Sequence, residues 1–222
     1  MNILVIGEVE NLEECKTRFG DSHTYMFETD HREAERFIET NDLVFDFIID
    51  EEPFQIDIYK NKSNGIVFFN AAKISLAELS NLAEHSIKAD VYGFNGLPTF
   101  VSQEILEVSL LKPEHEDQLK EICAKLDIHY LIVDDRVGLV TPRVVCMIIN
   151  EAYYTVQDGT ASREDIDKAM KLGTNYPYGP FEWCSLIGIK HVYELLEALY
   201  EDTHDERYKI CSLLKKEYLL QS

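Results

Sequence analysis

Short apolar runs alternate with polar, helix-compatible stretches from residue 1 to residue 137. The apolar runs predict buried strands, and the stretches between them predict helices. Strands are expected at residues 2–7, 25–27, 43–49, 65–69, 91–94, 105–110 and 130–133. Helices are expected at residues 11–19, 31–40, 75–84 and 114–126. This alternation is typical of an α/β domain, with a mostly parallel sheet and helices on its faces.

The rest of the chain shows no strand pattern and predicts an all-helical domain. Apolar residues recur at every fourth position of one long predicted helix, with others beside them: Val140, Val144, Ile148, Ala152 and Val156, then Val145, Ile149 and Tyr153. They form a wide apolar stripe. Further helices are expected at residues 162–173, 180–187, 190–200 and 205–219. We therefore expect two domains, residues 1–137 and 138–222.

Four short motifs in the helical half stand in a characteristic order. They are GLVTPR at 138–143, NEA at 150–152, EDIDKAM at 164–170 and GTNYPYGPFE at 173–182. Together they resemble the C-terminal domain of the 3-hydroxyacyl-CoA dehydrogenases. The resemblance implies that the first half is a Rossmann-like domain, truncated because the stretch between residues 27 and 41 is short. It also implies a role in acyl-CoA metabolism, in which the family transfers a hydride between NAD and C3 of a 3-hydroxyacyl-CoA.

The resemblance also points to catalytic positions. The family uses a His as general acid/base and a Glu that orients it. Tyr92 stands at the His position, Glu107 at the Glu position, and Asn95 at the Asn of the same motif. An ordinary phenol, with a pKa near ~10, is a poor base at neutral pH. Ala72 and Pro142 replace two further polar residues that assist the family's reaction.

The turn that binds the dinucleotide in the family is only partly kept. Of the pattern Gly-x-Gly-x-x-Gly, Gly7 remains, whereas Val9 and Leu12 stand at the other two positions. The missing glycines would permit close approach of the backbone to the pyrophosphate. Glu28 stands where an acid that binds the ribose belongs. Gly7 and Glu28 are therefore the candidate NAD-binding residues.

Charge and cysteine content narrow the classes of partner. The chain has 41 acidic and 21 basic residues and a formal net charge of −20, which disfavours binding to nucleic acid or to an anionic membrane. The N-terminus lacks a signal-peptide pattern, and no apolar run reaches the ~18 residues of a membrane span. Five cysteines without a CxxC pair indicate reduced, buried thiols in a cytoplasmic protein. None of the seven histidines forms a metal-binding motif, so no metal site is expected.

Two functional interpretations follow. The favoured one is a degenerate relative with lost or very weak NAD-dependent activity, which serves as a binding or regulatory module. The alternative is an active 3-hydroxyacyl-CoA (3-hydroxybutyryl-CoA) dehydrogenase with an atypical site formed by Tyr92 and Glu107. NAD and acyl-CoA, the ligands that the resemblance implies, are both polyanions, and residues 1–137 carry a net charge of −16.

The helical half predicts a homodimer under either interpretation. Its net charge is only −4, so two copies can approach each other through this half. Its apolar stripe is wider than a helical domain of about 85 residues readily covers. The resemblance points the same way, because C-terminal domains of the family pair as two-fold dimers.

Overall fold

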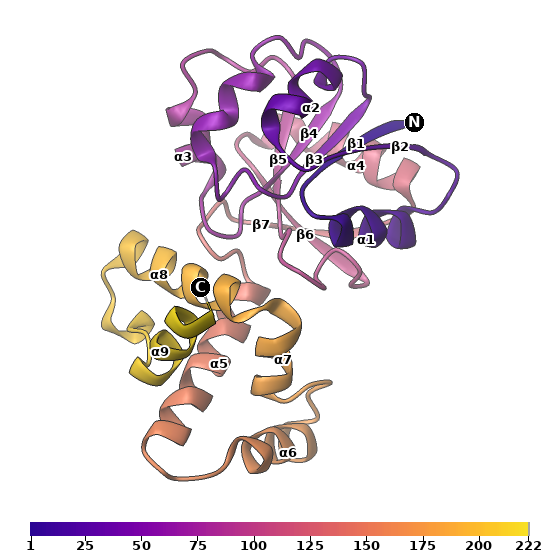
Figure 1. Cartoon of the computed structure of the whole chain (residues 1–222). Helices are drawn as coiled ribbons and strands as arrows, with labels where there is room; N and C mark the ends of the chain where they lie inside the picture. The colour runs from indigo at the N-terminus through magenta and orange to yellow at the C-terminus, as the bar shows by residue number, and fades with distance from the viewer. Residues whose placement is uncertain (222) are drawn as a thin grey trace. The chain divides into compact units, whose positions relative to one another are not determined.

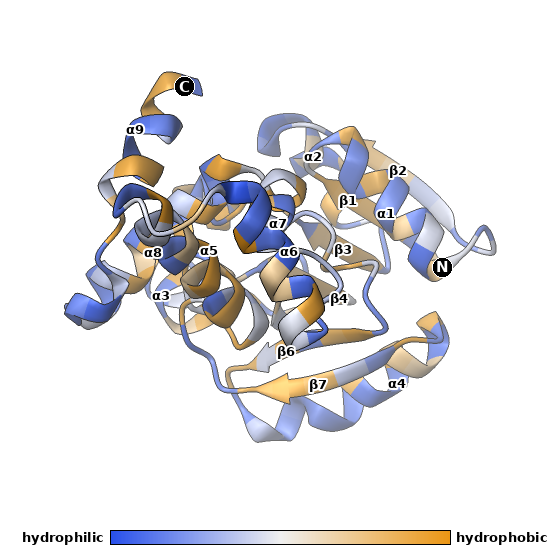
Figure 2. Cartoon of the chain, turned by 90° about the horizontal axis from the view of Figure 1, so that it is seen from below, coloured by the Kyte–Doolittle hydropathy of each residue, from blue (hydrophilic) through white to orange (hydrophobic). Residues whose placement is uncertain are grey.

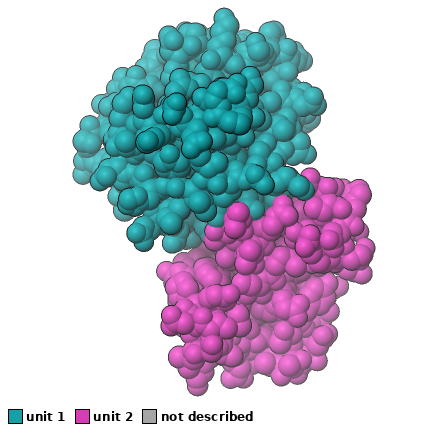
Figure 3. All heavy atoms as spheres, turned by 180° about the vertical axis from the view of Figure 1, so that it is seen from behind, with its two compact units in different colours: residues 1–139 teal, residues 140–222 magenta. Residues whose placement is uncertain are grey.

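The computed structural model describes residues 1–221 and divides the chain into two compact units, residues 1–139 and 140–222 (Figure 3). The sequence pattern placed a domain boundary near residue 137. The two units differ in class, since unit 1 is α/β and unit 2 is all-helical.

Unit 1 is built on a single sheet, which has seven strands within the described residues (Figure 1). The strands are β1 (Asn2–Ile6), β2 (Thr24–Glu28), β3 (Leu43–Asp46), β4 (Ile66–Asn70), β5 (Asp90–Phe94), β6 (Ile105–Leu110) and β7 (His129–Val133). The α-helices are α1 (Val9–Phe19), α2 (His31–Ile38), α3 (Leu76–Leu82) and α4 (Glu116–Leu126). Two 3-10 helices, η1 (Pro53–Tyr59) and η2 (Pro113–His115), were not predicted from the sequence.

The order of the strands confirms the predicted, mostly parallel α/β fold. It is β2-β1-β3-β4-β5-β6-β7, and only the β5–β6 pair is antiparallel. The chain runs from β1 outward to β2 and then returns to the other side of β1 as β3. The carboxyl ends of β1 and β3 therefore form the topological switch point, where ligands bind in open α/β sheets.

Each face of the sheet has its own apolar core. One core contains α1 and α4 side chains and a group of aromatic rings, in which Phe45 stacks on Phe68 with 4.9 Å between ring centroids. The other core contains residues of α2, α3 and η1 packed on Val44, Val67 and Phe69. Because successive strand residues alternate between these faces, each strand position is assigned to one core.

Unit 2 is a helical domain organised around one long helix, much of which is coloured as hydrophobic in Figure 2. Its helices are α5 (Thr141–Gln157), α6 (Arg163–Thr174), α7 (Pro180–Ile187), α8 (Ile189–Thr203), η3 (Glu206–Tyr208) and α9 (Ser212–Gln221). Pro142 lies in the first turn of α5, where its missing N–H leaves no hydrogen bond unmade. The prediction of an all-helical second half is confirmed.

Several predicted helix boundaries in unit 2 are wrong, and two of them have a clear structural reason. The helix expected at 205–219 begins only at Ser212. The buried Asn150 side chain donates to the carbonyl of Lys209 and accepts from the amide of Cys211, so these backbone groups are not available to a continuous helix. Gly173 does not end α6, which continues to Thr174 and is closed by Asn175 in the left-handed conformation.

The five cysteines are free and buried, as the sequence predicts. Across residues 1–221, no helix combines the length and the apolar character that crossing a bilayer requires.

Candidate functional site

The register of β5 and β6 decides which candidate catalytic residues come together. Tyr92 of β5 lies opposite Leu110 of β6, and Phe94 lies opposite Val108. These four side chains pack in the core that contains α4, with Leu110 only partly buried. Glu107 precedes Val108 and therefore projects to the opposite face. The backbone amide of Asn95 donates to the Glu107 carbonyl over 3.3 Å. The structure therefore brings Asn95 and Glu107 together and separates Glu107 from the Tyr92 side chain.

Tyr92 is a core residue in the structure. It is fully buried, and its hydroxyl donates to the carbonyl of His115 over 3.0 Å. Burial, with smaller contributions from Asp90 and Cys123, raises the pKa of the phenol far above its ordinary value. The proton relay between Tyr92 and Glu107 that the sequence left open is therefore wrong, because the sheet lies between the two side chains.

The turn after β1 is filled by the chain itself. The Asn11 side chain folds back and accepts from the amide of Glu8 over 2.8 Å. A Cβ at Gly7 would lie 2.6 Å from the Asn11 Oδ1 and 3.0 Å from the Phe47 Cβ. Gly7 is thus needed for the packing of Asn11 and Phe47, and the space that its missing side chain leaves is occupied by an amide oxygen.

This turn does not fit a dinucleotide. In a Rossmann fold, free backbone amides at the start of the first helix bind the pyrophosphate. Here the Glu8 amide already donates to the Asn11 side chain. Val9 is the first residue of α1, and its side chain is exposed. Leu12 packs against the core beneath. Glu28 lies half-buried at the end of β2, and its carbonyl accepts from the amide of Gly7 over 3.0 Å.

Helix α3, which starts at the same edge of the sheet, is also capped by a side chain of unit 1. Asp135, after β7, accepts from the amides of Leu76 and Ala77 at 2.8 and 2.9 Å. Ser109 donates to the same carboxylate over 3.2 Å. The positive end of the α3 dipole is therefore already paired with a carboxylate of unit 1.

Asn70, which was not among the predicted site residues, organises the carboxyl ends of three neighbouring strands. Its amide group donates to the Phe47 carbonyl and to Asp50, both over 3.0 Å. Its oxygen accepts from the amides of Gly96 and Ala72 at 3.0 and 3.3 Å. A polar residue that ends an otherwise apolar strand, IVFFN, was the available signal. These bonds use both ends of the amide, so Asn70 acts here as a structural crosslink.

A second group missed from the sequence is a buried ionisable cluster at the end of β3. His31, the first residue of α2, lies between two carboxylates: its Nε2 is 2.9 Å from Asp46 and its Nδ1 is 3.1 Å from Glu52. Tyr59 donates to the same Asp46 oxygen over 2.8 Å. His31, Asp46 and Tyr59 are almost completely buried, whereas Glu52 is half-exposed.

The protonation of His31 follows from this environment. Burial by itself lowers its pKa, but hydrogen bonds and charge attraction from Asp46 and Glu52 outweigh burial and raise the pKa above its ordinary value. The signal in the sequence was again a polar residue, Asp46, at the end of the apolar strand LVFD.

The most specific motif of unit 2 has a structural explanation. Asp167 of α6 accepts from the amides of Phe181 and Glu182 at 2.8 and 3.2 Å, and so caps the first turn of α7. Gly179 lies directly against the Asp167 side chain, where a Cβ would collide with it. The string around Tyr178-Gly179-Pro180 therefore positions one helix end on another.

The outer face of α5 carries an apolar groove of about 560 Å³. Val145, Ile149 and Tyr153 from the predicted stripe are buried inside unit 2, whereas Val144 is 53% exposed. The groove is lined by residues of α5, α6, α7 and η3: Arg143, Val144, Met147, Ile148, Glu151, Ala152, Thr155, Ile166, Met170, Pro180, Arg207 and Tyr208. Only one side of the stripe is therefore covered by the unit's own helices.

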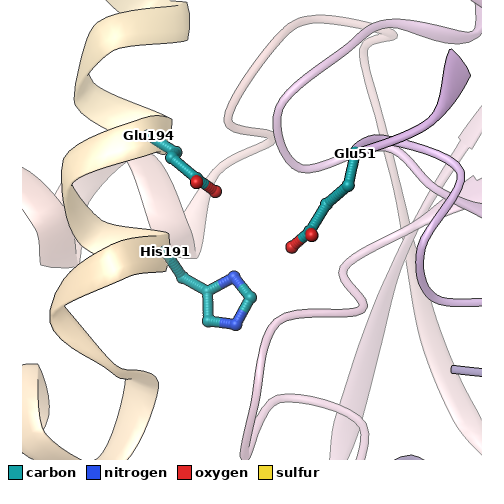
Figure 4. Close-up of side chains that lie close together, drawn as sticks. All are labelled: Glu51, His191 and Glu194. Atoms are coloured by element: carbon teal, nitrogen blue, oxygen red, sulfur yellow. The ribbon is translucent and has the colours of Figure 1, made fainter. Parts of the chain in front are cut away.

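Figure 4 shows His191 and Glu194, which lie one turn apart on the same side of α8, as their spacing of three requires. Glu51, drawn with them, belongs to the loop after β3 in unit 1.

Comparison with known proteins identifies unit 2 by its sequence. Residues 138–221 match the family of 3-hydroxyacyl-CoA dehydrogenase C-terminal domains. Residues 138–221 thus form a 3-hydroxyacyl-CoA dehydrogenase C-terminal domain. It is 48% identical over 92 residues to the 3-hydroxyadipyl-CoA dehydrogenase of Escherichia coli, covering 41% of this chain and 19% of that protein. It is 29% identical over 181 residues to the 3-hydroxybutyryl-CoA dehydrogenase of Clostridioides difficile, covering 79% and 64%. The chain thus spans less than two thirds of either relative.

The solved structures confirm the fold. M. tuberculosis FadB2 superposes with a TM-score of 0.77 and 16% identity, and the match covers 99% of this chain and 93% of that one. At this identity the likeness concerns the fold alone. The Rossmann-like fold of unit 1 that the family resemblance implied is confirmed.

Proposed function

We propose that this chain is a non-catalytic member of the 3-hydroxyacyl-CoA dehydrogenase family, with a crevice that no longer binds NAD. The observation that carries the proposal is the closed turn after β1, where Asn11 occupies the Glu8 amide beside Gly7. The position of Tyr92 supports it, because the phenol is buried on the face opposite Glu107. The high negative charge of residues 1–137 also opposes binding of NAD and acyl-CoA.

The proposed working form is a homodimer that acts as a binding or regulatory module in the cytoplasm, connected with acyl-CoA metabolism. Two copies would meet through the α5 groove, whose floor is apolar and whose rim carries Arg143, Arg207 and Glu151. A two-fold axis places the same patch on both copies. Because the rim has both signs of charge, the Glu151 of one copy can approach an arginine of the other.

A turnover assay tests the loss of activity. With NADH and acetoacetyl-CoA, we expect kcat below about 0.01 s⁻¹, against ~10 s⁻¹ for a typical enzyme. Tyr92→His restores the residue type of the family but not its activity, since position 92 faces the core. The measurement is the absorbance of NADH between pH 7 and pH 9.

The alternative interpretation makes the opposite forecast for the same assay. A measurable rate that rises with pH and disappears in Glu107→Gln would show that the chain is a dehydrogenase and that the proposal is wrong. The absence of NADH oxidation by the wild type supports the proposal only if a 3-hydroxybutyryl-CoA dehydrogenase is active under the same conditions.

A further inference from the structure

The segment that follows β3 leaves the sheet at the topological switch point. The amide of Phe47 donates to the Ile6 carbonyl at the end of β1 over 2.8 Å, and the segment then continues through Glu52 into η1. One side of this segment is fixed to β4, because Asn70 donates to Phe47 and Asp50. Residues 47–59 therefore begin at the topological switch point, beside the carboxyl ends of β1 and β3.

On its other side, the segment contacts α2 through Ile56 and Tyr59 of η1, which share an apolar core with α2, and through the ring of His31. The two nitrogens of His31 contact two different carboxylates, Asp46 on β3 and Glu52 on the segment. A doubly protonated imidazole donates to both of them, whereas a neutral imidazole has only one N–H to donate. The number of carboxylates that His31 can hold is therefore set by its protonation.

The two carboxylates differ in what they can do when one contact is lost. Asp46 is completely buried and also accepts from the Tyr59 hydroxyl and the Ile48 amide, so it cannot be rehydrated without opening the core. Glu52 is 56% exposed and can return to water at little cost. The remaining N–H therefore stays with Asp46, and the Nδ1 lone pair then faces the Glu52 carboxylate.

We propose that His31 is a proton-operated latch: its imidazolium donates to Glu52 and holds the loop before η1 against α2, and loss of one proton releases Glu52 and loosens this loop. The charged groups around the ring agree with this assignment. Asp46, Glu52 and Tyr59 come from β3, the segment and η1. On α2 itself, Asp30 is engaged by the Glu33 amide and Glu33 by Arg36.

The strands beneath α2 add no competing base. β1 contains no titratable side chain, and β2 contributes Glu28 at its carboxyl end. The net surroundings of His31 are therefore anionic, which favours the closed, protonated state, in agreement with its raised pKa.

Hydrogen exchange at two pH values tests the latch in the full chain. After correction for the intrinsic exchange rate, we expect the amides of residues 50–59 to lose about tenfold in protection between pH 6 and pH 9. Amides of β4 are the internal control and should not change. The Glu52→Ala variant, which has no group to bond the ring, should have low protection at both pH values, and a lower pKa for the His31 ring by NMR.

The matched control is Glu35→Gln, which removes an exposed carboxylate from the same helix and should keep the wild-type dependence on pH. Protection of residues 50–59 that is independent of pH in the wild type overturns the proposal. So does a Glu52→Ala variant that shows the same tenfold loss as the wild type. Neither result depends on whether the crevice binds NAD.

Discussion

Replacing His31 with alanine is expected to lower the free energy of unfolding of unit 1 by about 3–5 kcal/mol. The substitution leaves the Asp46 carboxylate completely buried without its cationic partner, with only the Tyr59 hydroxyl and the Ile48 amide as donors. Denaturation followed by far-UV circular dichroism measures the loss. Trp183, the single tryptophan, lies in unit 2, so its fluorescence should report an unchanged transition.

The pH dependence of this loss has a definite sign. Because the pKa of His31 is raised in the folded state, its contribution is complete below the unfolded value of ~6.5 and declines as the pH rises through the folded value. The difference between wild type and His31→Ala should therefore shrink above neutral pH. His129→Ala, at an exposed position on β7, is the control and should change stability by less than ~0.5 kcal/mol. Equal effects of the two substitutions would contradict the role of His31.

If the proposed homodimer forms through the α5 groove, replacing Ile148 with aspartate is expected to leave a monomer of 25.7 kDa. Ile148 lines the α5 groove and is only partly covered by its own unit, so the substitution places a charge at the proposed contact between copies without opening the core. An unpaired charge buried there costs several kcal/mol of association free energy. Light scattering at micromolar concentration measures the mass.

The matched control for Ile148→Asp is Leu131→Asp, which changes an exposed leucine of β7 in unit 1. This variant should keep the mass of the dimer, twice that of a single chain. A wild-type mass of 25.7 kDa at all concentrations would show that the groove does not join two copies. A dimer that survives Ile148→Asp but not Leu131→Asp would place the interface on unit 1 instead.

The sequence predicted the elements because their signals are local. Buried strands such as LVFD and the stripe on α5 follow from hydrophobic periodicity, which needs no knowledge of distant residues. The helix expected at 205–219 was partly wrong because Asn150, far earlier in the chain, binds the backbone at Lys209 and Cys211. Such a tertiary hydrogen bond leaves no periodic pattern.

The candidate site was predicted less completely, and the reason is again non-local. The residue types at 92, 95 and 107 could be read from the motif, but the face that each occupies depends on how β5 and β6 pair across residues 95–104. A shift of one residue in that pairing moves a side chain to the other face. The closure of the turn by Asn11 was equally invisible, because an Asn three residues into a helix is ordinary by composition.

Calorimetric titration of the full chain with NAD tests the central claim most directly, because it measures binding without requiring catalysis. The Asn11 side chain occupies the Glu8 amide, and Val9 stands at the start of α1. We therefore expect no saturable heat and a Kd above about 1 mM, which corresponds to a binding free energy of less than ~4 kcal/mol. A stoichiometric isotherm with a micromolar Kd would contradict the account.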